Sequence, residues 1–121
     1  MKRVLIVEDQ ADIRELIRMT LEIEDLDIHE AENGDIGWDM AGRLQPDLVL
    51  LDIMMPGSLD GFAVCDRIKG DTRLRHTKVV FLSAKGQDAD KRQGKQSGGD
   101  GYLTKPFSPK QLLEMVNRHL G

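Results

Sequence analysis

Short strand-like segments alternate with longer stretches of helical periodicity along the chain. Residues 4–7, 48–51 and 79–82 are continuous apolar runs, the pattern of strands that are buried on both faces of a sheet. Two further short strands are expected over residues 27–31 and 101–104. Each strand is followed by a helical stretch. This alternation predicts a parallel sheet with helices on both faces, because crossover connections are nearly always right-handed.

The first two helical stretches are indicated mainly by apolar spacing. The first extends from about residue 10 to about residue 24. The second opens at residues 33–34 and ends before Pro46, because the residue before a proline avoids the α region. The apolar face of this second helix is expected to consist of Ile36, Met40 and Leu44.

The remaining helices differ in the strength of their signals. The third helix ends near Gly70 and has an apolar face of Phe62, Val64, Cys65 and Ile68. The helix expected over residues 88–97 has hardly an apolar residue, so we expect it to be the most mobile one. The last helix has the clearest start, a capping box of Ser108 and Gln111 with Pro109 at its first position. Its buried face is expected to be Leu112, Leu113, Val116 and Leu120.

Length and charge restrict the classes of protein that fit. A chain of 121 residues is long enough for one core and too short for a second, so residues 1–121 are expected to form one domain. The formal charge of −4 argues against direct nucleic-acid binding, which would need lysine and arginine clustered on one face. The lone Cys65 excludes an intramolecular disulfide, and the histidines lack the spacing of zinc ligands.

The apolar runs also bear on membranes. No run approaches the about 18 residues of a membrane span, and the start of the chain is too short for a signal peptide. No membrane association is expected, and the cytoplasm is the expected location.

Polar residues that can bind a ligand or take part in a reaction stand at the ends of four expected strands. Glu8 and Asp9 follow the first strand, Asp52 ends the third, and Ser83 and Lys105 stand at the ends of the fourth and fifth. The carboxyl ends of parallel strands share one edge, where open α/β sheets bind ligands, so these side chains should converge. Carboxylates about 4 Å apart repel by about 4 kcal/mol at an effective dielectric constant of 20. The cluster therefore needs a cation, and hard oxygen ligands favour Mg²⁺ beside a phosphoryl group.

Each of these residues also has an ordinary structural explanation. Asp52 can be a turn former, and Asp9 can cap the first helix. Ser83 can cap the helix after it, and Lys105 can be a solvated charge. These explanations would have to hold at four strand ends at once, which favours a shared site.

The same positions carry a resemblance to a known family. In order and spacing, the chain resembles end to end the receiver domain of bacterial response regulators, of the chemotaxis-regulator kind. The segments concerned are residues 8–9, 52–57, 83–84 and 102–107, with the sequences ED, DIMMPG, SA and YLTKPF. The resemblance implies a flavodoxin-like α/β fold, a doubly wound (βα)₅ arrangement whose five-stranded parallel sheet has the order 2-1-3-4-5. It also implies a phosphorylation-switched signalling domain, and no enzyme beyond its own Mg²⁺-dependent phosphoryl transfer and dephosphorylation.

The resemblance assigns chemical roles by position. Asp52 would be the phosphoacceptor, and Lys105 would pair first with Asp52 and then with a phosphoryl oxygen. Mg²⁺ would be coordinated by Asp9, Asp52 and the backbone carbonyl of Met54, with Glu8 acting through metal-bound water. Such a site transfers a phosphoryl group by positioning it and neutralising the charge on its oxygens.

The resemblance also implies a switch. Ser83 would donate its hydroxyl to the phosphoryl group, and Tyr102 would then turn inward to fill the space left behind. This would remodel the face formed by the helix over 88–97, the strand over 101–104 and the last helix. A cis peptide bond would precede Pro106, where the trans preference is only about 0.5–1 kcal/mol.

Partners follow from the same resemblance. The phosphodonor would be a histidine kinase or a phosphotransfer protein of a two-component system or phosphorelay. An output partner would bind the remodelled face, and a homodimer that forms on phosphorylation is compatible with it. No output domain is expected within residues 1–121.

The chain departs from the family pattern in a few places. The loop over residues 56–61 is one residue longer than the commonest spacing. Gly37 and Gly101 stand where a residue with a side chain is commoner, and each should reduce local order. Met54 and Lys85 flank the site and should influence the lifetime of the phosphorylated state.

Other functions fit the sequence less well. A flavodoxin-like small-molecule or nucleotide-binding module would need a glycine-rich phosphate loop after the first strand, where acids stand instead. A silent receiver used only for binding is disfavoured because every site residue is present. A hydrolase that uses two spaced aspartates is disfavoured because Met54 occupies the second position.

Overall fold

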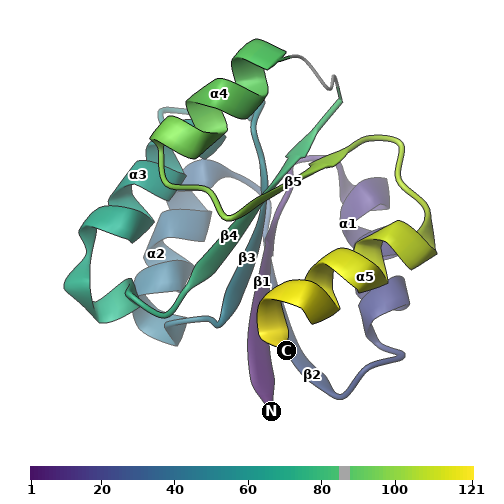
Figure 1. Cartoon of the computed structure of the whole chain (residues 1–121). Coiled ribbons are helices and arrows are strands. Elements are labelled where there is room, and N and C mark those ends of the chain that lie inside the picture. Colours follow the sequence, from purple (N-terminus) through teal and green to yellow (C-terminus); the bar gives the residue numbers. More distant parts are fainter. Residues whose placement is uncertain (85–87) are drawn as a thin grey trace.

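A five-stranded parallel sheet with the order β2-β1-β3-β4-β5 forms the centre of the molecule (Figure 1). The computed structural model describes residues 1–84 and 88–121, with the backbone alone for residues 88–90. The strands are β1 (Lys2–Val7), β2 (Leu26–Ala31), β3 (Leu48–Asp52), β4 (Lys78–Ser83) and β5 (Gly101–Thr104). The helices are α1 (Ala11–Leu21), α2 (Gly34–Leu44), α3 (Gly61–Gly70), α4 (Asp88–Gln96) and α5 (Pro109–Leu120), with a 3₁₀ turn, η1 (Thr72–Leu74). The predicted fold class and strand order are confirmed.

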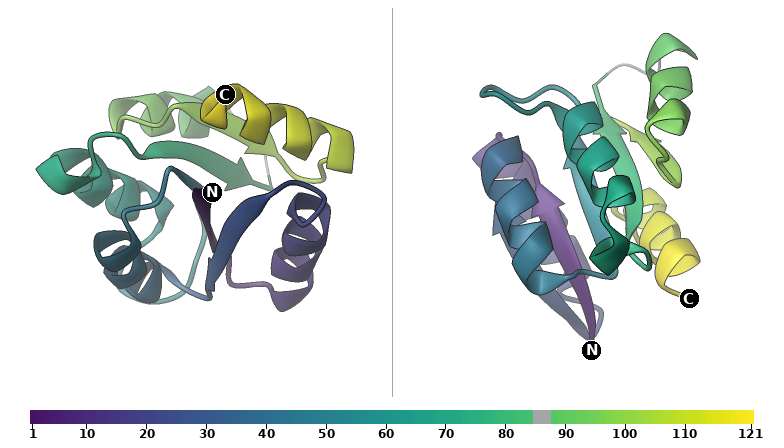
Figure 2. Two further views of the ribbon diagram at one scale, coloured as in Figure 1. Left: turned by 90° about the horizontal axis from the view of Figure 1, so that it is seen from below. Right: turned by 90° about the vertical axis from the view of Figure 1, so that its left-hand side faces the viewer.

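Helices cover both faces of this sheet (Figure 2). Leu5 and Val7 of β1 belong to a cluster that includes side chains of α2 and α3. Val4 and Ile6 belong to the other cluster, which includes side chains of α1 and α5. Strands β1, β3 and β4 are thus buried on both faces, which explains why their sequences are continuous apolar runs.

Helix α1 ends three residues earlier than its periodicity predicted, at Leu21 in place of Glu24. The backbone N–H of Glu24 donates to the carbonyl of Leu21 (3.0 Å), and that of Leu26 donates to the carbonyl of Glu24 (3.0 Å). This turn leads the chain directly into β2 and leaves Ile23 exposed. The need to enter the sheet, which is a tertiary constraint, therefore ends the helix.

The predicted apolar face of α2 is confirmed at Met40, which packs half-buried against the core, but not at Ile36. Gly34, Gly37 and Ala41 are buried, whereas Ile36 is exposed and Met40 and Leu44 are only half-buried. A Cβ atom on Gly37 would lie 2.8 Å from Cγ1 of Val7, closer than van der Waals contact allows. The helix lies against β1 on small residues, so Gly37 has a packing role.

Helices α4 and α5 start and end close to their predicted bounds. Among residues 91–96 only Gly94 is buried, which agrees with the expected lack of an apolar face on α4; its mobility stays a prediction. In α5 the side chain of Ser108 accepts from the backbone N–H of Gln111 (3.1 Å), and the Gln111 side chain accepts from that of Ser108 (2.8 Å). The capping box is therefore confirmed, as is the cis Lys105–Pro106 peptide bond.

Within residues 1–84 and 88–121, none of the helices has the length and apolar character needed to cross a lipid bilayer. The longest, α5, has 12 residues, whereas a spanning helix needs about 20.

Candidate functional site

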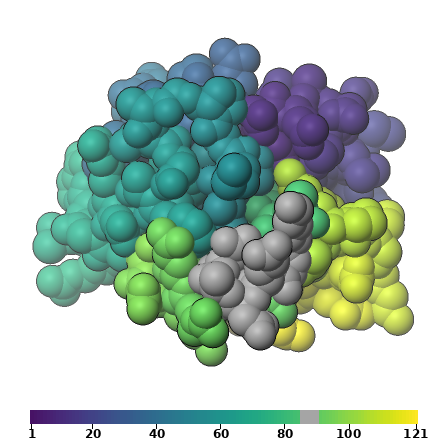
Figure 3. All heavy atoms as spheres, turned by 90° about the horizontal axis from the view of Figure 1, so that it is seen from above, coloured from purple at the N-terminus to yellow at the C-terminus, as the bar shows by residue number. Residues whose placement is uncertain are grey.

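The polar residues at the strand ends meet at one edge of the sheet. In the register of the strands, Val7 lies beside Leu51, and Asp52 lies beside Leu82. The residues that follow these strands therefore lie at the same end of the molecule. From above, the chain after β1, the loop after β3 and the loop after β5 lie around this end (Figure 3).

Three carboxylates form the centre of this site. One oxygen each of Glu8, Asp9 and Asp52 lies within 4.8 Å of the others. Glu8 is fully buried and Asp52 is 5% exposed, whereas Asp9 is open to solvent. Carboxylates held this close repel one another strongly where water is excluded. Their oxygen atoms are the ligands that Mg²⁺ prefers, so the donor set fits a divalent cation.

Lys105 supplies the positive charge of the site. Its ammonium forms a hydrogen-bonded ion pair with the carboxylate of Glu8 and lies 3.5 Å from Oδ1 of Asp52. The resemblance implied a pair with Asp52, which is present, but Glu8 is the nearer partner. One ammonium thus faces two buried carboxylates, with the third carboxylate, of Asp9, close by. When all four groups are ionised, the site carries two negative charges in excess.

This arrangement changes the protonation of the phosphoacceptor candidate. Burial raises the pKa of Asp52 to about 7, with a further contribution from the neighbouring Glu8 charge and partial opposition by Lys105. Burial would also raise the pKa of Asp9, but hydrogen bonds with Glu8, Asp52 and the backbone, together with the Lys105 charge, lower that pKa. With a pKa of about 7, Asp52 is protonated in about half of the molecules at neutral pH when no cation is bound.

The two switch candidates lie on neighbouring strands. Ser83, at the end of β4, is buried and lies beside Thr104 in the β-sheet register. Tyr102 on β5 lies beside Phe81 and is half-buried, with the ammonium of Lys91 5.7 Å from the centre of its ring. A cavity of about 170 Å³ lies between α4 and β5, and its lining includes Phe81, Gly94, Gly99 and Tyr102.

Of the two residues expected to flank the site, only Met54 belongs to the described part of the chain. The side chain of Met54 is 79% exposed, and the role of its carbonyl as a metal ligand stays a prediction. Lys85 lies outside the described residues.

The sequence patterns did not point to Arg14, which also reaches the site. Its guanidinium donates to the backbone carbonyl of Glu8 (2.8 Å) and is paired with Glu30 of β2 (Nε–Oε1 3.4 Å). A charged residue on a helix has no local signal that distinguishes it from a solvated surface residue. Only the packing of α1 against β2 shows this contact.

The sequence of this chain is similar to those of a known protein family. The sequence profile described as "Response regulator receiver domain" matches residues 4–117. The chain belongs to this family. As a receiver domain of two-component response regulators it is a signalling domain, and the flavodoxin-like small-molecule-binding alternative is not favoured.

Individual relatives agree with this assignment. The chain is 44% identical over 116 residues to the DNA-binding dual master transcriptional regulator RpaA of Synechocystis, covering 96% of this chain and 48% of that protein. It is 39% identical over 115 residues to the phosphate regulon transcriptional regulatory protein PhoB of Escherichia coli, covering 95% and 50%. The chain thus spans about half the length of the curated relatives it matches.

Solved structures show the same fold over the whole chain. The chemotaxis protein CheY4 of Vibrio cholerae matches with a TM-score of 0.91 at 28% identity, covering 98% of both chains. A putative response regulator from Chloroflexus aurantiacus matches with a TM-score of 0.92 at 27% identity, covering 98% of this chain and 97% of that one.

Proposed function

We propose that this receiver domain accepts a phosphoryl group on Asp52 from a phosphohistidine of a histidine kinase or phosphotransfer protein. The observation that carries this proposal is the convergence of Glu8, Asp9 and Asp52 within 4.8 Å, with the Lys105 ammonium beside them. Glu8 is fully buried and is the nearer partner of the Lys105 ammonium, and Asp9 has no ion pair with it. Asp52 ends β3 beside these two acids, is 5% exposed and lies 3.5 Å from the ammonium. We therefore assign the attack on phosphorus to Asp52, while the other three side chains bind the cation or neutralise charge.

Asp9 and Asp52 are proposed to coordinate Mg²⁺ with the carbonyl of Met54, and Glu8 to act through a bound water. When bound, the cation would neutralise charge on the phosphoryl oxygens, the main electrostatic requirement of phosphoryl transfer. The excess of negative charge in the site, and the proton that Asp52 retains near pH 7, both support a cation requirement. Release of that proton converts Asp52 to the carboxylate needed for attack.

In the transfer step, an oxygen of the ionised Asp52 forms a bond to phosphorus opposite the leaving nitrogen. The P–N bond breaks, and its electron pair stays on the imidazole of the donor. The other ring nitrogen of the phosphohistidine is protonated, so the leaving group is neutral histidine. Lys105 stays near the acceptor and pairs with a phosphoryl oxygen, which balances the charge gained by the site. Hydrolysis later returns Asp52 and inorganic phosphate. Under this proposal, the domain catalyses its own phosphorylation and dephosphorylation.

The signal is proposed to travel from Ser83 to Tyr102. The phosphoryl group adds about −1.5 to −2 charge and three acceptor oxygens, towards which the Ser83 hydroxyl would turn. The cavity beside Tyr102 offers space into which its ring can move. The remodelled face of α4, β5 and α5 would then control an output partner or form a homodimer, and residues 1–121 would act as one receiver domain.

Phosphorylation of the purified chain tests the proposal. Incubation with Mg²⁺ and acetyl phosphate should add the mass of one phosphoryl group, and beryllofluoride should occupy the same site. Asp52→Asn should remove both responses, whereas Asp39→Asn, which changes an exposed carboxylate of α2, should keep them. A wild-type protein that is folded but takes up no phosphoryl group with Mg²⁺ would refute the proposal.

A further inference from the structure

The acidic segment that follows β1 lacks the usual local anchor at a helix start. Helix α1 begins after Gln10, whose side chain makes no capping hydrogen bond. The backbone N–H of Glu8 donates to the carbonyl of Ala31 (3.1 Å), and that of Gln10 donates to Oε2 of Glu8 (3.2 Å). Neither of these bonds involves the carbonyl groups of Glu8 and Asp9, which can accept hydrogen bonds from partners elsewhere in the chain.

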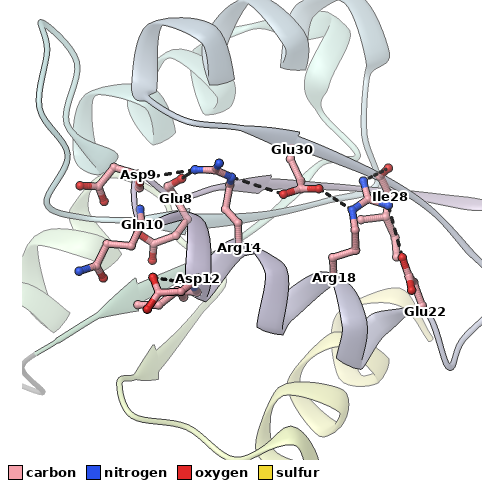
Figure 4. Close-up of polar contacts among 10 residues, drawn as sticks. Glu8, Asp9, Gln10, Asp12, Arg14, Arg18, Glu22, Ile28 and Glu30 are labelled. Carbon is pink, nitrogen blue, oxygen red and sulfur yellow. Dashed lines mark hydrogen bonds and ion pairs between the residues drawn. The ribbon is translucent and has the colours of Figure 1, made fainter.

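Arg14 provides those partners. Its Nη1 group donates to the carbonyl oxygen of Glu8 (2.8 Å), and it lies 3.4 Å from that of Asp9 (Figure 4). One guanidinium thus bridges two successive peptide groups, and these belong to the two residues that supply carboxylates to the cluster. A planar guanidinium is suited to this task, because its donors have a fixed geometry.

Arg14 is in turn held by an ion pair with Glu30 on β2, whose Oε1 lies 3.4 Å from Nε of Arg14. The other oxygen of this carboxylate, Oε2, accepts a hydrogen bond from Nε of Arg18. Arg18 also donates to the carbonyl of Ile28 (3.0 Å), which ties this arrangement to β2 (Figure 4). The side chain of Arg14 is 18% exposed, against 71% for Arg43, which forms an ordinary surface pair with Asp39.

The Glu30 carboxylate also matters for charge. A lone guanidinium next to the acidic cluster would repel a divalent cation. Arg14 shares Glu30 with Arg18. Arg18 also pairs with Glu22 (3.7 Å), so these two arginines and two glutamates together add no net charge. Arg14 can therefore donate hydrogen bonds to the backbone without adding net positive charge beside the site.

We propose that Arg14, held by Glu30, is a positioning residue that fixes the backbone of Glu8 and Asp9 so that their carboxylates are preorganised for a divalent cation. This inference rests on the proposed function, because it assumes that the cluster binds Mg²⁺. Groups that orient metal ligands without touching the metal affect affinity about 10-fold to 100-fold. Arg14 acts on backbone atoms of the ligands, so the lower end of this range applies.

Titration of the full chain with Mg²⁺ alone, by calorimetry below the unfolding temperature, tests this inference. Arg14→Met should weaken Mg²⁺ binding about tenfold. Glu30→Gln should weaken it less, and adding Glu30→Gln to Arg14→Met should cause no further loss, because both act through one contact. Arg14→Lys keeps the positive charge but lacks the several fixed donors of a guanidinium, so its Mg²⁺ affinity should lie between those of the wild type and Arg14→Met. Arg43→Met, the matched control on α2, should bind as the wild type does.

The outcomes separate this inference from the proposed function. A wild type that binds no Mg²⁺ overturns both. A wild type that binds Mg²⁺ and an Arg14→Met variant that binds it equally well overturn the positioning role alone, even where the variant has a lower melting temperature. If Arg14→Met does not fold, wild-type affinity in both Arg14→Lys and Glu30→Gln overturns it. Additive losses from Arg14→Met and Glu30→Gln would also contradict action through a single contact.

Discussion

Replacing Asp52 by asparagine should make the stability of the protein less dependent on pH. The pKa of Asp52 is raised to about 7 in the folded protein, from an ordinary value of 3.8. The folded state therefore binds this proton more tightly than the unfolded chain does. The resulting stabilisation is fully present below the ordinary value and is lost as the pH rises through about 7.

The size of this effect follows from the same two values. From about pH 5 up to its folded-state pKa, Asp52 holds a proton that the unfolded chain has lost, a range of roughly two pH units. Over this range the free energy of unfolding falls by about 1.4 kcal/mol for each pH unit. The free energy of unfolding should therefore fall by about 3 kcal/mol more in the wild type than in Asp52→Asn, which cannot titrate at this position. Above the folded-state pKa, Asp52→Asn should be the more stable protein, because it also lacks the repulsion from Glu8.

Urea unfolding followed by the fluorescence of Trp38 measures this difference. Urea titrations of both proteins are carried out at each pH in the absence of divalent cations. Asp39→Asn, which changes an exposed carboxylate, is the matched control. Saturating Mg²⁺ should stabilise the wild type at high pH, since a ligand that binds only the folded state raises its stability. A difference between wild type and Asp52→Asn that stays constant over this range would refute the assigned protonation of Asp52.

Two further changes probe the packing and charge around the site. Gly37→Ala should destabilise the fold by about 1–3 kcal/mol, because the new Cβ would lie 2.8 Å from Cγ1 of Val7; Gly70→Ala, which meets no atom within 4 Å, is its control in urea unfolding. A Gly37→Ala protein as stable as Gly70→Ala would contradict the close approach of α2 to β1. Lys105→Ala should lower the free energy of unfolding by about 3 kcal/mol at neutral pH, because it leaves the buried Glu8 carboxylate without its cation. Added Mg²⁺ should restore part of that loss, and an unchanged urea midpoint in its absence would count against the ion pair.

The sequence predicted most elements because their signals are local. A strand buried on both faces must be apolar throughout, so β1, β3 and β4 were visible as continuous runs. The start of α5 was visible because Ser108 and Gln111 satisfy each other's backbone groups within one turn. The buried face of α2 was predicted correctly only at Met40, because apolar spacing does not reveal that Gly37 lets the helix lie directly on Val7.

By itself, the sequence determined which residues stand at the strand ends and what chemistry they can perform. The order of strands and short links is enough to bring Glu8, Asp9, Asp52 and Lys105 to one edge of a parallel sheet. Only the tertiary structure decided that Lys105 pairs more closely with Glu8 than with Asp52, and that burial raises the pKa of Asp52. It also brought Arg14 to the backbone of the acidic segment. Charge interactions depend on distances and on exclusion of water between distant parts of the chain, and neither is encoded in local spacing.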